Sequence, residues 1–209
     1  MKKNIFKSFL FFLILFFSIS IKSFAAEKSF TIDKLDINAV ILPNGDVNIT
    51  EQLSYNFTGN FNGIYRDYNL KGCSGCQINE VKIIDQDNNE YVAANNSSEA
   101  DLTYEVSNSD GNKKLKLFCK SSDEVKTFII NYTIQNAAVK YSDVGQLYWN
   151  FYELNDEVDE IKKGSLNISL ENDAFQDGSL SYTIYGDGSI TTSDSPYLVS
   201  IKFRIFLLL

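Results

Sequence analysis

Glu51 is the residue whose position most calls for a chemical explanation. It shares one side of an alternating segment with apolar side chains, which is typical of the buried face of a strand: Val47, Ile49, Leu53, Tyr55 and Phe57. A buried carboxylate without a partner is costly, and the planar guanidinium of Arg66 is well shaped to pair with one. We therefore expect a structural Glu51–Arg66 ion pair that holds the loop after this strand against the sheet. The alternative is a catalytic carboxylate, although no second carboxylate is placed to act with it.

Three cysteines form the second chemical feature. Cys73 and Cys76 enclose a CSGC motif, and Cys119 lies far along the chain. Three cysteines without histidine do not complete a usual structural zinc site, and no helix follows the motif as in a redox CxxC. Outside the membrane a disulfide is the natural end state. Two pairings stay open: a tight Cys73–Cys76 clasp, or a bond from either cysteine to Cys119.

Aromatic side chains offer a third possibility, the binding of a sugar or a peptide. The densest cluster follows residue 140, where Leu147, Trp149 and Phe151 share a parity that favours the core. Tyr148 and Tyr152, on the other parity, and Tyr65 are the candidates for a binding surface.

Conventional catalytic chemistry lacks its usual residues. The chain has no histidine, and no GxSxG, P-loop, dinucleotide fingerprint or zinc-protease helix occurs. Acidic clusters at 85–90 and 155–160 are interpreted as solvated turns and not as calcium sites, since Glu90 stands where an EF-hand loop needs glycine. We predict a protein that is not an enzyme and has no metal or cofactor.

The elements around these residues are short strands separated by turn signals, and no segment has a long helical period. Runs on both sides of Pro43-Asn44-Gly45-Asp46 predict a long antiparallel hairpin over residues 30–57. Further strands are expected at 78–84, 90–94, 102–106, 113–120, 124–135, 147–151, 166–170, 180–184 and 197–206. This pattern predicts an all-β antiparallel β-sandwich, for which an immunoglobulin- or fibronectin-III-like architecture is one possibility.

The N-terminus has the layout of a secretory signal peptide. Lys2, Lys3 and Lys7 precede an apolar run over 9–21, and Ser23-Phe24-Ala25 places small residues where a signal peptidase cuts. We predict cleavage after Ala25, with an uncleaved membrane anchor as the alternative. Cleavage removes four lysines and no acid, which leaves 15 basic and 27 acidic residues and a net charge of −12. Such a domain repels nucleic acid.

The predicted domains are the signal peptide, 1–25, and an extracytoplasmic β-sandwich, 26–209. Because the chain closes on the apolar run Phe206–Leu209, a β domain over 28–172 with an incomplete C-terminal part over 173–209 is also expected.

Two blocks of motifs resemble a known family. Phe30 to Leu70 contains Gly45-Asp46, Thr50-Glu51 and Gly63-Ile64-Tyr65-Arg66-Asp67, and a second block pairs residues 128–133 with Gln146-Leu147-Tyr148-Trp149-Asn150. Over about 30–170 the chain resembles the YciQ-like predicted bacterial membrane proteins, a family of unknown function, although Gln146 replaces the family's usual Glu.

The resemblance implies an extracytoplasmic β-rich domain that is secreted or at the cell surface and, in the full-length family, anchored by transmembrane helices. No such helix is expected in this mature chain, which would then be the outer domain of a longer protein. Three functions remain: binding of an unidentified envelope protein or polymer, assembly through a sheet edge, and, least favoured, a carboxylate-based glycosidase.

Overall fold

The computed structural model describes residues 28–109, 111–142, 145–152 and 161–171, together with the backbone of four further strands within 181–208. The predicted signal peptide, 1–25, and the acidic cluster at 155–160 lie outside the described residues, as does most of the predicted C-terminal part.

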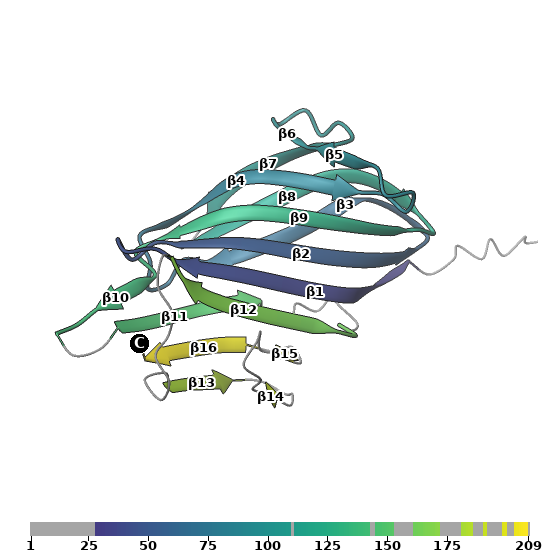
Figure 1. Cartoon of the computed structure of the whole chain (residues 1–209). Coiled ribbons are helices and arrows are strands. Elements are labelled where there is room, and N and C mark those ends of the chain that lie inside the picture. The colour runs from purple at the N-terminus through teal and green to yellow at the C-terminus, as the bar shows by residue number, and fades with distance from the viewer. Residues whose placement is uncertain are drawn as a thin grey trace, which may run out of the picture.

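Every regular element in the described part of the chain is a strand, which confirms the all-β class (Figure 1). The first eight strands are β1 (Ser29–Ile41), β2 (Val47–Thr58), β3 (Asn60–Asn69), β4 (Gly75–Ile84), β5 (Glu90–Val92), β6 (Ala94–Asn95), β7 (Thr103–Ser109) and β8 (Asn112–Ser122). The next eight are β9 (Val125–Gln135), β10 (Ala138–Lys140), β11 (Gly145–Tyr152), β12 (Gly164–Leu170), β13 (Ser181–Tyr185), β14 (Ile190–Thr191), β15 (Leu198–Val199) and β16 (Phe203–Leu208).

The strands form two sheets that face each other, with a further sheet beside them. The larger sheet has the order β12-β1-β2-β9-β4-β5, and the sheet β3-β8-β7-β6 lies behind it in Figure 1. Their inner faces share one core, in which the rings of Tyr68 on β3 and Tyr132 on β9 are 4.7 Å apart. A third sheet, β10-β11-β16-β13, lies below, and β14 pairs with β15.

The predicted hairpin over 30–57 is confirmed. β1 and β2 pair antiparallel from Ser29 opposite Thr58 to Ile41 opposite Val47, with a bulge near Ile32. The alternating apolar residues of both strands are buried, because each points into the core between the sheets.

Gly59 folds one long antiparallel ribbon over on itself. β2 and β3 belong to different sheets yet are separated only by this residue, whose φ of +85° lies in the left-handed region that glycine adopts without strain. Beside it, only Asp123 and Glu124 separate β8 from β9, and Asp123 Oδ1 accepts a hydrogen bond from the Gly59 amide at 2.7 Å. The pair β2–β9 therefore continues at the corner as the pair β3–β8.

Two expectations need correction. The segment after β2 is the strand β3 and not a loop, because the chain turns sharply at Gly59 and pairs at once with β8. The sheets are also not purely antiparallel, since β12 pairs parallel with β1 and β6 pairs parallel with β7. Alternation reveals which face of a strand is buried but carries no information on the direction of its neighbour.

Gly63 permits the close approach of β3 to β8 beside a bulge. A Cβ atom at this position would lie 1.9 Å from the carbonyl oxygen of Leu117. We expect Gly63→Ala to lower the free energy of unfolding by about 3 kcal/mol, because a backbone atom cannot move aside cheaply. In Gly72→Ala, where no atom lies within 4 Å, we expect only the cost of a left-handed backbone, about 1 kcal/mol. Urea unfolding of both variants measures the difference, and equal losses would contradict the packing argument.

Candidate functional site

Glu51 and Arg66 form an ion pair in the centre of the core. Both side chains are buried, and the Arg66 guanidinium binds the carboxylate through two nitrogens. Nη2 donates to Glu51 Oε2 at 2.9 Å, and Nε donates to Oε1. The structure thus brings together the two residues that the sequence singled out, but it joins two facing sheets rather than a loop and a sheet.

Aromatic residues enclose this pair. Tyr132 donates its hydroxyl to Glu51 Oε2 at 3.3 Å, and the carbonyl oxygen of Phe151 accepts from Arg66 Nη2 at 3.0 Å. The ring of Tyr152 lies 4.0 Å from the guanidinium carbon of Arg66, and the ring of Tyr68 lies 5.2 Å from it. The ion pair therefore ties together β2, β3, β9 and β11.

Electrostatics favour the charged form of Arg66 and the neutral forms of the tyrosines around it. Burial opposes the charge of Arg66, but the adjacent Glu51 outweighs it, so the pKa of the guanidinium stands well above its ordinary value. Burial also raises the pKa of Tyr68 and of Tyr132, and the Glu51 carboxylate adds to both shifts. The Glu51 carboxylate is buried and accepts two hydrogen bonds from Arg66, so it has no access to a substrate. The geometry therefore favours the structural role.

The three cysteines are free thiols in this structure. Cys76 pairs opposite Ile134 on β9, whereas Cys119 adjoins Lys120, whose carbonyl oxygen accepts a hydrogen bond from Lys126. Lys126 lies eight positions before Ile134 on β9, a separation of about 26 Å along the strand. Cys73 lies near the beginning of β8, away from Cys119, since its amide donates to Leu70 O and the Leu70 amide donates to Gly111 O. A disulfide needs Cα atoms about 4–7 Å apart, so this geometry is incompatible with a bond to Cys119. The Cys73–Cys76 clasp stays a prediction.

Of the three tyrosines predicted at the surface, Tyr152 is buried. Tyr65 on β3 is 47% exposed and Tyr148 on β11 is 38% exposed, whereas Tyr152 is 4% exposed and packs on Arg66. The prediction for Tyr152 is wrong because the pairing of β11 with β16 is irregular between Trp149 and Tyr152. Such an irregularity breaks the alternation of faces, so that Phe151 and Tyr152 are both buried.

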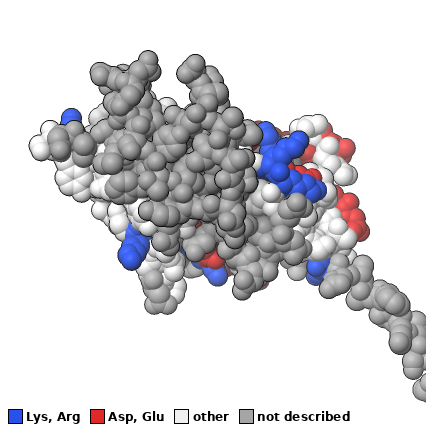
Figure 2. All heavy atoms as spheres, turned by 90° about the horizontal axis from the view of Figure 1, so that it is seen from below, with Lys and Arg blue, Asp and Glu red and all other residues white. Residues whose placement is uncertain are grey.

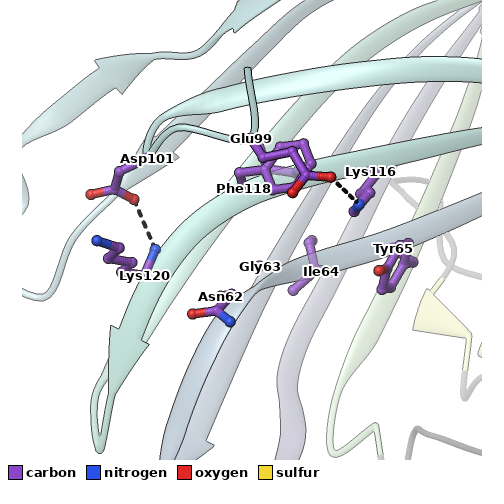
Figure 3. A pocket seen from close by; sticks show the side chains of 10 residues that line it. Asn62, Gly63, Ile64, Tyr65, Glu99, Asp101, Lys116, Phe118 and Lys120 are labelled. Carbon is purple, nitrogen blue, oxygen red and sulfur yellow. Dashed lines mark hydrogen bonds and ion pairs between the residues drawn. The ribbon is translucent and has the colours of Figure 1, made fainter. Parts of the chain in front are cut away.

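Tyr65 borders a hollow of about 390 Å³ on the outer face of the sheet β3-β8-β7-β6, here called the Tyr65 hollow. Gly63, Ile64, Leu117 and Phe118 line it together with six outward-facing residues: Asn62, Tyr65, Glu99, Asp101, Lys116 and Lys120. Figure 3 shows Glu99 and Asp101 above β8 and Asn62 and Tyr65 on the β3 side.

The loop over residues 96–102 forms the upper wall of the hollow. Glu99 and Leu102 have positive φ values of 56° and 60°, and the Leu102 amide donates to Phe118 O at 2.9 Å. Lys116 Nζ donates to Glu99 Oε1 at 3.1 Å, while the Lys120 amide donates to Asp101 Oδ1 at 2.8 Å (Figure 3). These bonds fix the wall, so the hollow presents amide, phenol, ammonium and carboxylate groups in set positions.

Only Tyr65 of this group was expected from the sequence. Asn62, Gly63 and Ile64 adjoin Tyr65 on β3, whereas the lining residues outside β3 come from segments more than 30 positions away, and their meeting depends on the pairing of β3 with β8. Gly63 is the one sequence signal for the hollow, because a glycine within a strand often marks the close approach of another backbone.

The acidic cluster at 85–90 forms a turn that is held by its own hydrogen bonds. In the acidic cluster at 85–90, Asp85 accepts hydrogen bonds from the Asp87 and Asn89 amides, as in a turn. No group of three metal-binding side chains occurs among the described residues, and no helix there is long and apolar enough to cross a bilayer.

Comparison with known proteins identifies one family. The model described as "Predicted membrane protein (DUF2207) N-terminal domain" matches residues 31–204. A search of curated proteins finds no match.

Solved structures resemble the chain only distantly. A proposed protease from Parabacteroides distasonis has 10% identity and a TM-score of 0.46, and the alignment covers 87% of this chain and 35% of that one. An M1 zinc metallopeptidase from Deinococcus radiodurans has 9% identity and a TM-score of 0.44, with 86% and 42% covered. The chain therefore spans less than half the length of these proteins.

The central ion pair makes a testable contribution to stability. We expect Glu51→Gln or Arg66→Met to lower the free energy of unfolding by about 3–5 kcal/mol, because each leaves a buried polar group without its partner. The double variant Glu51→Gln/Arg66→Met should cost less than the sum of the single variants, because neither partner then leaves the other charged and unpaired. Lys82→Met is the control, since the Lys82–Glu90 pair, 2.9 Å apart, lies in a more exposed position and should contribute less than about 1 kcal/mol. Urea unfolding gives all four values, and additive losses would contradict the coupling.

The thiols should differ in reactivity. Burial raises the pKa of Cys76 from 9.0 to about 12, so at pH 9 roughly a thousandth of its groups are thiolate. Iodoacetamide should label Cys73, which is half-buried, well before Cys76 in the folded protein, as peptide mass spectrometry would report. Since the folded-state pKa is raised, the neutral Cys76 thiol contributes stability below pH 9 that is lost as the pH rises toward 12. Equal labelling rates would show that Cys76 is not protected.

Proposed function

Because the chain belongs to the family of predicted membrane proteins that carry the DUF2207 N-terminal domain, we propose that its sandwich is a non-enzymatic binding domain on the outer side of the cell membrane. The predicted signal peptide at 1–25 supports export. The partner we propose is a polar polymer of the cell envelope, bound in the Tyr65 hollow.

The single observation that carries this proposal is the hollow itself. It is open to solvent, rigid, and lined by hydrogen-bonding groups that converge from β3, β8 and the loop over 96–102. The exposed ring of Tyr65 adds an apolar surface with a hydroxyl at its edge. A few polar groups around an aromatic ring are the usual means of orienting a small segment of a ligand.

The charges of the hollow favour a ligand rich in hydroxyl and amide groups. Lys116 is engaged by Glu99 at 3.1 Å and by Glu105 at 3.6 Å, and Lys114 is 3.7 Å from Asp67. These acids offset the positive charge of β8, so the site is not a cationic groove for a polyanion. A glycan chain, or the amide groups of peptides attached to one, matches this balance.

A catalytic role has less support. The buried Glu51 is held by Arg66, and the two carboxylates of the hollow are exposed and already engaged, Glu99 by Lys116 and Asp101 by the backbone of Lys120. A glycosidase needs one carboxyl group whose surroundings favour its protonated form.

Assembly through a sheet edge is the second candidate function. β3 is ten residues long and stands at the end of its sheet, where β8 is its one partner strand in the described part of the chain. An exposed strand edge of this length can accept a strand from another protein.

Binding is tested with purified peptidoglycan sacculi in a co-sedimentation assay. We expect Tyr65→Ala/Asn62→Ala to weaken binding about tenfold, equivalent to about 1.4 kcal/mol, because the ring and amide on the β3 side of the hollow are lost. Tyr91→Ala, at a tyrosine of similar exposure on β5, is the matched control and should bind normally.

Circular dichroism and urea unfolding establish that both variants are folded. If the parent chain does not bind sacculi, or if Tyr91→Ala loses as much affinity as the double variant, the proposed site is wrong. Binding to another protein that survives Tyr65→Ala/Asn62→Ala would favour the strand edge instead.

A further inference from the structure

The end of the sandwich formed by the β1–β2 turn, the β10–β11 hairpin and the last residues of β12, here called the hairpin end, exposes apolar side chains. Val139 is 44% exposed and Tyr141 is 52% exposed. A hollow of about 560 Å³ opens between the same segments, and its apolar lining includes Leu42, Pro43 and Leu170. An exposed apolar cluster beside a hollow is a place where a partner or a membrane can bind.

The charge distribution distinguishes this end. Lys140 lies between Val139 and Tyr141, and Glu171 is the one acidic residue that lines the hollow. Asp46 in the β1–β2 turn accepts hydrogen bonds from the Asn44 side chain and the Asn136 amide. Seen from below, the described residues in view at the left are uncharged or basic, and the acidic ones in view lie near the middle and at the right (Figure 2). A tyrosine and a lysine beside an aliphatic residue suit the boundary between lipid headgroups and acyl chains.

The direction of β16 also distinguishes the hairpin end. β16 pairs antiparallel with β11, from Phe203 opposite Tyr152 to Leu208 opposite Gln146, so it runs toward the β10–β11 hairpin (Figure 1). β1 begins at the opposite end, where Ser29 pairs with Thr58. In the DUF2207 family this domain is the N-terminal part of a membrane protein, so the rest of such a protein continues from the end that β16 approaches.

We propose that the hairpin end rests on the lipid surface, with Val139 and Tyr141 in the interfacial layer and Lys140 among the headgroups. The long axis of the larger sheet then stands away from the bilayer and carries the opposite end outward. This inference concerns the orientation of the domain and does not depend on what the Tyr65 hollow binds.

The test places a fluorescent side chain at each end of the full chain, which carries a C-terminal hexahistidine tag. Tyr141→Trp and its control Tyr91→Trp are bound to phosphatidylcholine vesicles that contain nickel-chelating lipid, with or without bromine on the acyl chains. Tyr91 lies on β5 and pairs opposite Ile83 on β4, away from the hairpin end. Its side chain is also exposed. The parent chain gives the background from the buried Trp149.

We expect brominated lipid to reduce the added emission of Tyr141→Trp at least twofold and to leave that of Tyr91→Trp unchanged. Both variants are checked for native folding by circular dichroism. Unchanged emission from Tyr141→Trp would overturn the proposal. So would stronger quenching of Tyr91→Trp, which is the outcome expected if the opposite end faces the lipid.

Discussion

A carboxylate and a guanidinium meet at the centre of this domain because a ribbon of strands folds over at Gly59. Glu51 lies eight residues before that corner and Arg66 seven residues after it, so the two side chains arrive opposite each other as the sheets close. Burying two charges is expensive, and only full hydrogen bonding offsets the cost. Here Tyr132 and the carbonyl of Phe151 add further hydrogen bonds, so the ion pair joins the two sheets with both of its charged groups bonded.

The same contact positions the outer surface. Tyr65 and Arg66 are neighbours on β3, and successive side chains of a strand point to opposite faces. When Arg66 is held by Glu51 inside the core, Tyr65 is therefore directed outward toward the hollow that it borders. Gly63 is also in close contact with the Leu117 backbone, so β3 is held at two nearby positions. The residues of the hollow on β3 are therefore positioned by the same strand that carries Arg66.

Much of this arrangement follows from local patterns. Alternation from Val47 to Phe57 identified the buried row and the polar residue within it, and the cost of an isolated charge led to Arg66 as its partner. Other features depend on long-range pairing that no local pattern records. The sequence predicts a loop in place of β3 because a one-residue corner leaves no turn signature, and it predicts an exposed Tyr152 because the irregularity in β11 leaves none either. The loop over 96–102 contributes to the hollow only through contacts with β8.

The parallel pairing of β12 with β1 has a consequence for how the chain folds. Leu35 pairs with Gly164 and Ile41 with Leu170, so the outer edge of the first strand stays uncovered until a segment 129 residues later has been made. Contacts of such separation form slowly, and an open strand edge is prone to associate with other chains. The ribbon around Gly59 can form early, whereas β1 keeps one edge unpaired until β12 has been made, so a partly folded chain exposes this edge to other chains.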